Sequence, residues 1–457
     1  MKASLQKAVF RRILRVVLLV LLVVSGYGAY YINSLLPIIT GYPAKYLCSA
    51  VFVSGREQAE VEAMDLHFSF IQYAKNKVDL KDSSVTSSFL WGKSKAIYRK
   101  GFGATLLRGV GEEELRKVKF PEIKLNYNPD TTHWPLGNIL PPKGSATDTV
   151  QLERIAEKLL DEDGYRGHAF GFMVVHKGVP VVEAYQPQFN EKTRFLSWSM
   201  AKSVTNALAG ILIRDGKLSL EQPAAIPEWQ NDERKKITIN DLLQMQSGLS
   251  WNEDYGNRSD VTTMLYCESD FARFAYTKPP KYSAGTHWYY SSGAVNALNY
   301  LMRKTIGNDY EYYRLSQERL FNKIGMVNAV FETDGSGTQV GSSYVYATVR
   351  DYARFGLLYL NEGKINGEQI LPEGWVKYTT TPASDSKGEY GALFWLNQAK
   401  EFPSAPADMY SCNGHDGQQI FVIPSKELVV VLVGYSPKPD RVMKFDELLG
   451  DILKTVQ

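Results

Sequence analysis

Residues 194–214, RFLSWSMAKSVTNALAGILIR, join a short apolar stretch to a long apolar run. The first part, Phe195-Leu196, predicts a strand, and the run that ends at Ile213 predicts a helix. Ser199 and Lys202 lie three positions apart where this helix begins, so their side chains share one helix face. The segment therefore predicts a serine and a lysine held side by side at the start of a helix.

This pair of residue types suits acyl transfer. A serine hydroxyl is a poor nucleophile at neutral pH and needs a base nearby. A lysine held among apolar side chains can lose its proton and act as that base. The same spacing occurs at Ser4–Lys7, in a basic terminus, and at Ser384–Lys387, in a polar loop. The alternative for Ser199 is a helix N-cap followed by a lysine that lies along an apolar surface, and this segment alone leaves both interpretations open.

Two later segments carry further polar residues next to predicted elements. The segment WYYSSG, residues 288–293, precedes a short helical run and places Tyr290 on a turn, from which its phenol can project into a cleft. The segment GHDGQQIFVIP, residues 414–424, leads through glycines into a strand, and the run 428–433 predicts the next strand of a hairpin. Glycines at such an entry allow a substrate backbone to approach the strand edge closely.

The order Ser-x-x-Lys, Tyr-x-Ser, His-x-Gly resembles the serine β-lactamase and penicillin-binding-protein superfamily. It is most similar to the class C β-lactamase-related branch, and within that branch to the 6-aminohexanoate-dimer hydrolases and related esterases. The resemblance covers roughly residues 160–456. The further segments that match the family pattern are Ile237–Leu243, Ser247-Gly248-Leu249, Gly325-Met326, Tyr346–Thr348, Arg350–Gly356 and Ile370–Pro372 with Trp375.

Two departures from the family pattern bear on the substrate. The second motif commonly ends in Asn, and here it ends in Ser292. The third motif is often Lys-Thr-Gly in penicillin-binding enzymes, where the lysine is a fixed cation that helps to hold a carboxylate; here His415 stands in that place. Histidine is largely neutral at pH 7 and holds an anion less firmly. These departures favour amide or ester hydrolysis over β-lactam hydrolysis.

The resemblance implies a role for each motif residue. Ser199 would attack the carbonyl and form an acyl-enzyme, and Lys202 would accept or shuttle its proton. Tyr290 would act as general base or acid toward the leaving group, with its pKa lowered by the nearby ammonium. The oxyanion hole would consist of the backbone N–H groups of Ser199 and Gln418. The substrate-binding residues would be His415, Gly417, Ser292 and Tyr255. For Tyr255 the alternative is packing alone.

The N-terminus predicts a membrane anchor. Val16–Val24 is an almost pure Val/Leu run, and small and aromatic residues extend it to Ile32, about 17 residues without charge, the lower edge for spanning a bilayer. The basic residues that precede this run are Lys2, Lys7, Arg11, Arg12 and Arg15. Basic flanks stay cytoplasmic, which predicts a single-pass protein of a bacterial-type inner membrane with its catalytic domain on the periplasmic side. The alternative is a cleaved signal peptide and secretion, with residues 26–29 as the cleavage region.

Composition excludes several other classes of protein. The 457 residues carry a net charge of only +3, and nothing suggests nucleic-acid binding. The six histidines are scattered without metal-ligand spacing, and no Gly-x-Ser-x-Gly or P-loop motif occurs. We therefore predict no metal and no organic cofactor. Three cysteines cannot all pair internally, and the sequence does not determine the oligomeric state.

We predict an α+β fold in which an antiparallel β-sheet is flanked by helices, with an inserted helical lobe at about residues 205–345. The expected order is a basic cytoplasmic segment at 1–15, an anchor or signal segment at 16–33, a β-rich appendage and connector at 37–150, and a hydrolase domain at 151–457. Within the appendage, Val51–Val53 is expected to open a strand.

Three functions are consistent with these observations. The first is a membrane-anchored serine hydrolase that acts on an amide or ester in a small molecule or peptide. The second is a peptidoglycan D-amino acid peptidase or a weak β-lactamase. The third is a catalytically silent relative that binds cell-wall peptides.

Overall fold

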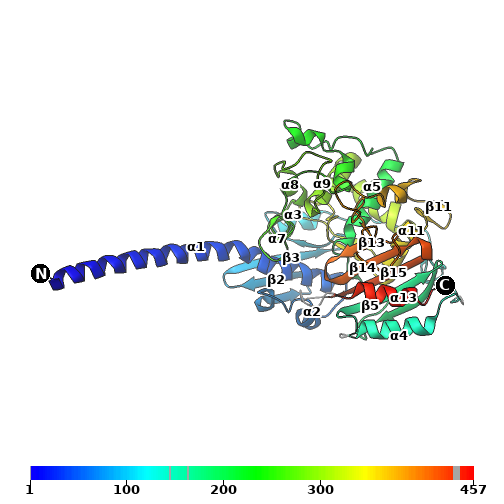
Figure 1. Ribbon diagram of the computed structural model, residues 1–457, viewed down its shortest axis with the longest axis horizontal. Helices are drawn as coiled ribbons and strands as arrows, with labels where there is room; N and C mark the ends of the chain where they lie inside the picture. The colour runs from blue at the N-terminus through cyan, green and yellow to red at the C-terminus, as the bar shows by residue number, and fades with distance from the viewer. Residues whose placement is uncertain (1, 144–145, 162–163, 436–442, 457) are drawn as a thin grey trace.

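A single long helix dominates the shape of the molecule. The computed structural model describes residues 2–143, 146–161, 164–435 and 443–456. Helix α1 (Lys2–Phe52) has 51 residues, and its first half projects from a folded body (Figure 1). The segment Val9–Phe52 is long and apolar enough to cross a membrane, and none of its most apolar window is buried. Signal sequences meet the same criteria.

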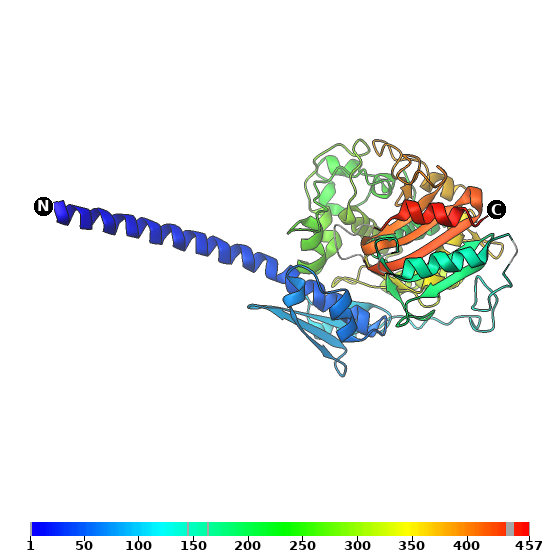
Figure 2. The ribbon, with the colours of Figure 1, turned by 60° about the horizontal axis from the view of Figure 1, so that its bottom comes forward.

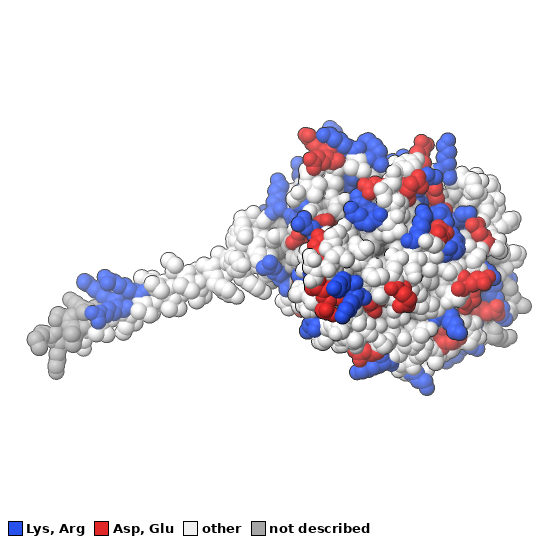
Figure 3. All heavy atoms as spheres, turned by 90° about the horizontal axis from the view of Figure 1, so that it is seen from above, with Lys and Arg blue, Asp and Glu red and all other residues white. Residues whose placement is uncertain are grey.

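Charge is distributed unevenly along this helix. Arg11, Arg12 and Arg15 are exposed near its free end, and the following stretch up to the body carries no charged side chain (Figure 3). The body shows both signs of charge on the same view. Between Arg15 and the body, α1 thus presents mainly apolar, aromatic and small side chains to its surroundings.

The second half of α1 belongs to the folded body. The helix continues through Pro37 and Pro43 to Phe52, and residues such as Leu47 are completely buried. The strand expected at Val51–Val53 is therefore wrong. A short apolar run does not distinguish helix from strand, and an existing helix extends at little cost when its new residues pack.

A small β-sheet packs against this buried half. It contains four antiparallel strands in sequence order, and they run alongside α1 (Figure 2). These strands are β1 (Lys75–Asp79), β2 (Ser84–Phe89), β3 (Gly92–Arg99) and β4 (Gly103–Leu106). A hydrogen bond of 2.6 Å between Thr40 Oγ1 and Ser94 Oγ joins the helix to β3. Short helices flank the sheet: α2 (Gln58–Met64) and α3 (Glu112–Lys117).

The main sheet has six antiparallel strands in the order β12-β13-β14-β15-β5-β6. Their bounds are β12 (Trp395–Leu396), β13 (Tyr410–Gly414), β14 (Gln418–Ile423), β15 (Leu428–Tyr435), β5 (His168–His176) and β6 (Val179–Tyr185). Alternate residues of these strands join different cores, as the period of a strand requires. Val430 and Leu432 pack with α4 (Thr149–Leu160) and α13 (Phe445–Leu453), whereas Val429 and Val431 pack with α5 (Met200–Arg214) and α11 (Val349–Leu360). The predicted α+β architecture is confirmed.

A helical lobe is inserted between α5 and α11. Its helices are α6 (Ile239–Leu243), α7 (Asp260–Cys267), α8 (Phe271–Tyr276), α9 (Ser292–Ile306) and α10 (Asp309–Arg314). A three-stranded sheet, in the order β7 (Phe195–Leu196), β9 (Val345–Ala347) and β8 (Val330–Phe331), joins the two ends of this insertion. It holds the chain directly before α5, where the predicted nucleophile lies. The chain also forms α12 (Trp375–Thr379), the hairpin of β10 (Lys364–Ile365) and β11 (Glu368–Gln369), and several short 3₁₀ and π segments.

Candidate active site

Ser199 and Lys202 are brought together at the start of α5. Ser199 is the N-cap residue of this helix, and only Ser197 and Trp198 separate it from strand β7. Trp198, which lies between β7 and Ser199, has φ +44°. This left-handed conformation is unusual for a large side chain, and it turns the chain sharply into the helix. One turn later, Lys202 Nζ donates to Ser199 Oγ at 2.9 Å. The expected neighbourhood of serine and lysine is thus present.

The amine of Lys202 is enclosed by hydrogen-bond partners. Its side chain is 1% exposed, and Nζ also donates to Ser292 Oγ at 3.0 Å and to the Ser342 carbonyl at 2.8 Å. Burial lowers the pKa of Lys202 to about 8, against the opposing effect of the Glu253 carboxylate. An ordinary lysine has a pKa of about 10.4, so this amine is far more often neutral near physiological pH. A neutral amine at 2.9 Å from the hydroxyl can accept its proton.

Tyr290 lies on the other side of the same pair. Lys202 Nζ lies 4.7 Å from the centre of its ring, and the Ser199 side chain is close enough to act on the pKa of its hydroxyl. Burial, and next the charge of Glu253, raise the pKa of Tyr290 above its usual range. The expectation that the lysine ammonium lowers this pKa is wrong, because enclosure and the carboxylate outweigh it. Tyr290 therefore stays protonated and is suited to donate a proton.

Glu253 is a part of the site that the sequence did not indicate. Its carboxylate accepts from Ser292 Oγ at 2.5 Å and from Ser292 N at 2.9 Å. It also accepts from Trp251 Nε1 at 2.5 Å and from the Tyr255 hydroxyl at 3.0 Å. Ser292 thereby accepts from Lys202 and donates to Glu253. A single acidic residue on a loop has no spacing pattern, so only the folded loop reveals it.

His415 and Tyr255 form the mouth of the site. Their rings are stacked with centroids 5.8 Å apart, and the Trp198 indole is perpendicular to the His415 ring at the same centroid distance. The His415 side chain is 55% exposed, and its Nε2 lies 3.2 Å from Asp416 Oδ1. Burial raises the pKa of Asp416 to about 6, although His415 acts in the opposite direction. The two predicted binding residues thus meet next to the nucleophile, with Tyr255 OH 3.5 Å from Ser292 Oγ.

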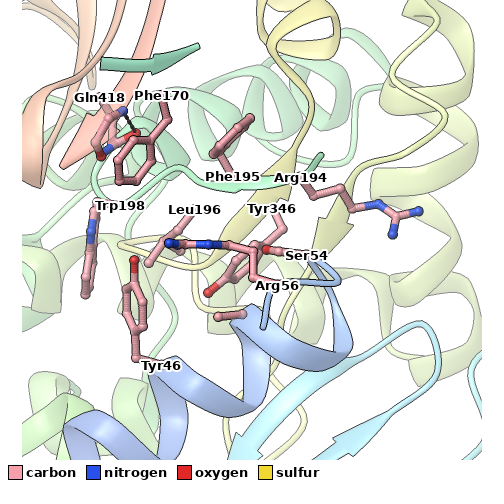
Figure 4. Close-up of a pocket in the computed structure, with 12 residues that line it drawn as sticks. Tyr46, Ser54, Arg56, Phe170, Arg194, Phe195, Leu196, Trp198, Tyr346 and Gln418 are labelled. Atoms are coloured by element: carbon pink, nitrogen blue, oxygen red, sulfur yellow. Dashed lines mark hydrogen bonds between the residues drawn. The ribbon is translucent and has the colours of Figure 1, made fainter. Parts of the chain in front are cut away.

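The segment from Gly414 to Gln418 lies behind this mouth. A Cβ on Gly414 would lie 2.2 Å from the Ser197 carbonyl oxygen, so the glycine allows the end of β13 to approach the chain next to Ser199. Gly417 has φ +84°, and a Cβ there would meet the Phe445 ring at 4.0 Å. The Gln418 side chain is bound to the Gly434 backbone, at 2.5 Å through Nε2 and 3.1 Å through Oε1, and lies beside Phe170 in Figure 4. A contribution of Gln418 to the oxyanion hole would come from its backbone N–H and stays a prediction.

The family follows from comparison with known proteins. The model of the family described as Beta-lactamase matches residues 152–451, well over half of the chain. The chain belongs to the Beta-lactamase family. Membership in this family, together with the serine–lysine pair, identifies it as a serine hydrolase.

Several relatives of this Beta-lactamase family member carry different names. The 6-aminohexanoate-dimer hydrolase of Paenarthrobacter ureafaciens is 23% identical over 346 residues, which cover 67% of this chain and 85% of that protein. The structure of a family VIII carboxylesterase has a TM-score of 0.56 at 14% identity, with 69% of this chain and 99% of that chain covered. A penicillin-binding protein homologue from Caulobacter crescentus has a TM-score of 0.53 at 15% identity, with the same coverage. Such distant structures establish the fold and leave the substrate open.

Proposed function

We propose that this protein is a membrane-anchored hydrolase that cleaves an amide or ester through an acyl-enzyme on Ser199. The observation that carries the proposal is the hydrogen bond of 2.9 Å between Lys202 Nζ and Ser199 Oγ, made by a lysine whose pKa is lowered by burial. A buried neutral amine next to a serine hydroxyl is the arrangement that activates this nucleophile.

The first half of the reaction forms the acyl-enzyme. Lys202 Nζ accepts the proton of Ser199 as Oγ attacks the substrate carbonyl. The carbonyl oxygen becomes an oxyanion, for which we propose the backbone N–H groups of Ser199 and Gln418 as donors. The bond between the carbonyl carbon and the leaving oxygen or nitrogen then breaks. Tyr290 gives its proton to the leaving atom and regains one from Lys202 through the Ser199–Tyr290–Lys202 contacts.

The second half returns the enzyme to its starting state. A water molecule attacks the acyl carbon and loses its proton to the same lysine–tyrosine pair. The bond to Ser199 Oγ breaks, and Oγ takes back a proton. Ser292 and Glu253 keep the lysine amine in place during both halves, because Ser292 Oγ accepts from Nζ while it donates to the carboxylate.

The mouth of the site favours an ordinary amide or ester over a β-lactam. His415 occupies the place where many penicillin-binding enzymes carry a lysine, and its neighbours are the rings of Tyr255 and Trp198. Aromatic faces bind apolar or neutral groups better than a carboxylate.

The test is turnover with detection of the intermediate. The full chain, in detergent or in a bilayer disc, is incubated with p-nitrophenyl acetate or butyrate and examined by intact-mass spectrometry. We expect release of p-nitrophenol and an acyl adduct that is absent in Ser199→Ala. The full chain is needed because residues after Leu36 in α1 are part of the buried core. Folded wild-type protein with neither turnover nor adduct would refute the proposal.

A further inference from the structure

An apolar groove lies where α1 enters the folded body. It has a volume of about 340 Å³, within the range of small-molecule binding sites. One wall consists of Leu35, Ile38, Ile39 and Tyr42, which share one face of α1 because they recur at helical spacing. The facing wall consists of the segment 68–71 of the appendage and parts of the catalytic lobe. The groove is therefore bounded by the anchor helix and by the hydrolase together.

The inner end of the groove reaches the catalytic residues. Trp198, Tyr255 and His415 line it, and Trp198 directly precedes the nucleophile. The Tyr255 hydroxyl lies 3.5 Å from Ser292 Oγ, which lies 3.0 Å from Lys202 Nζ. The groove is thus connected to Lys202 through two side chains, Tyr255 and Ser292.

The outer end of the groove opens beside the uncovered length of α1. Five large apolar or aromatic side chains are exposed there, and we call them the collar: Tyr30, Tyr31, Phe70, Leu90 and Trp91. Trp91 Nε1 donates to Asn33 Oδ1 at 3.1 Å, which fixes the turn between β2 and β3 against α1 (Figure 2). Tyr and Trp are the residues enriched at membrane–water interfaces. The collar therefore marks the level at which the bilayer would end and the groove begin.

The position of Tyr290 indicates which part of the substrate, the acyl group or the leaving group, lies toward the groove. The Tyr290 ring packs against Trp395 at 5.4 Å and Tyr390 at 5.8 Å, and neither of these residues lines the groove. Since Tyr290 protonates the leaving group in the proposed mechanism, the leaving group lies on that side. The acyl part of the substrate then lies toward Tyr255 and the groove.

We propose that this groove binds the hydrocarbon chain of an acyl group carried by an amphiphile in the bilayer, so that the substrate is a membrane-borne ester or amide. The inference rests on the proposed hydrolase function. The chain would enter past the collar and lie along α1, with its carbonyl carbon at Ser199 Oγ. Attack forms the Oγ–acyl bond and breaks the bond to the head group, which leaves with a proton, and water then releases a fatty acid.

A series of acyl chain lengths tests the groove. The full chain in phosphatidylcholine nanodiscs is assayed with p-nitrophenyl acetate, butyrate and octanoate, with Ser199→Ala as background. Each buried methylene is worth about fourfold in binding, so we expect kcat/KM for octanoate to exceed that for butyrate at least tenfold. Equal values for all three esters in a protein that turns over acetate would overturn the inference and leave the proposed function intact. Absence of acetate turnover and of any acyl adduct would instead refute the proposed function.

Two substitutions test whether the dependence of kcat/KM on acyl chain length arises in the groove. Ile39→Trp and Leu35→Trp fill the groove at two depths, and we expect each to lower the octanoate-to-acetate ratio of kcat/KM at least tenfold. Ile32→Trp is the matched control, because Ile32 lies on the same helix outside the lining, and we expect it to leave the ratio unchanged. An unchanged ratio in both groove variants, or an equal fall in the control, would overturn the assignment.

A vesicle assay tests delivery from the bilayer. The full chain is reconstituted in phosphatidylcholine vesicles that contain p-nitrophenyl palmitate, or is mixed with separate vesicles that contain this ester. We expect hydrolysis in the shared vesicles to be at least tenfold faster. Equal rates in the two arrangements would show that the substrate reaches Ser199 from solution and would overturn the membrane-borne substrate.

Discussion

Lys202 sets the pH dependence of the reaction at the scale of single residues. As a base it must be neutral, and burial lowers its pKa to about 8. We expect kcat/KM for p-nitrophenyl acetate to fall about tenfold per pH unit below that pKa and to level off above it. Lys202→Ala should lose about 10²- to 10⁴-fold in kcat/KM, the usual contribution of a general base. Lys454→Ala, at a lysine whose side chain is 78% exposed, serves as control. A rate that does not change between pH 6 and 9 would contradict the role of this amine.

Glu253 tunes the same amine from a distance. Its charge raises the pKa of Lys202, in opposition to burial, and its oxygens hold Ser292. Glu253→Gln removes the charge and keeps an acceptor, so we expect the acidic limb of the pH profile to move to lower pH. Asp254→Asn changes the next residue of the loop, whose carboxylate accepts from Gly256 N, and should leave the limb in place. If the acidic limb of the pH profile of Glu253→Gln stays at the same pH or moves to higher pH, Glu253 does not act through the pKa of Lys202.

Residue spacing predicted some parts of this site and missed others for physical reasons. The serine–lysine pair is local, because both residues belong to one turn of α5. The pKa of Tyr290 was predicted with the wrong sign, since its enclosure depends on how the lobe packs against the sheet. Glu253 was missed because its contacts with Ser292 join residues 39 positions apart. A contact of this kind leaves no pattern in a sequence.

Packing around α5 is decided at the scale of elements. Gly210 lies in this helix against the Trp375 ring, and a Cβ there would lie 2.7 Å from that ring. Alanine normally stabilises a helix relative to glycine, but here the clash dominates, and we expect Gly210→Ala to cost about 1–3 kcal/mol of unfolding free energy. Gly450→Ala in α13 meets only the Ser404 side chain, at 3.2 Å, and should be close to neutral. Chemical denaturation of the full chain compares the two, and equal stabilities would contradict the packing argument.

Element boundaries were less predictable than element types. Strands β14 and β15 lie where the segment 414–424 and the run 428–433 predict a hairpin. The anchor was expected to end at residue 33, where the uncharged apolar run ends, but helix α1 continues to Phe52 through Pro37 and Pro43. The helix persists through them because its second half is buried against β3 and α7. Tertiary packing of this kind overrides the helix-breaking tendency of proline and glycine, and it cannot be predicted from the local sequence.

Membrane topology is the prediction at the scale of the whole molecule. The arginines at positions 11, 12 and 15 precede the apolar length of α1, and such basic flanks stay cytoplasmic. We expect the full chain to remain in the membrane fraction after alkaline carbonate extraction, with the body digested by protease added from the periplasmic side. Mature protein that begins after residue 29 and appears in the soluble fraction would support the secreted alternative instead.

The unbroken course of α1 has a consequence for how such an enzyme would meet its substrate. One rigid rod joins the proposed bilayer edge near Ile32 to Tyr42, whose ring lies 6.2 Å from Trp198, over a rise of about 15 Å. Because this helix is continuous, it fixes the distance between the lipid surface and the nucleophile. Its catalytic rate would then follow the surface density of the substrate in two dimensions rather than its bulk concentration.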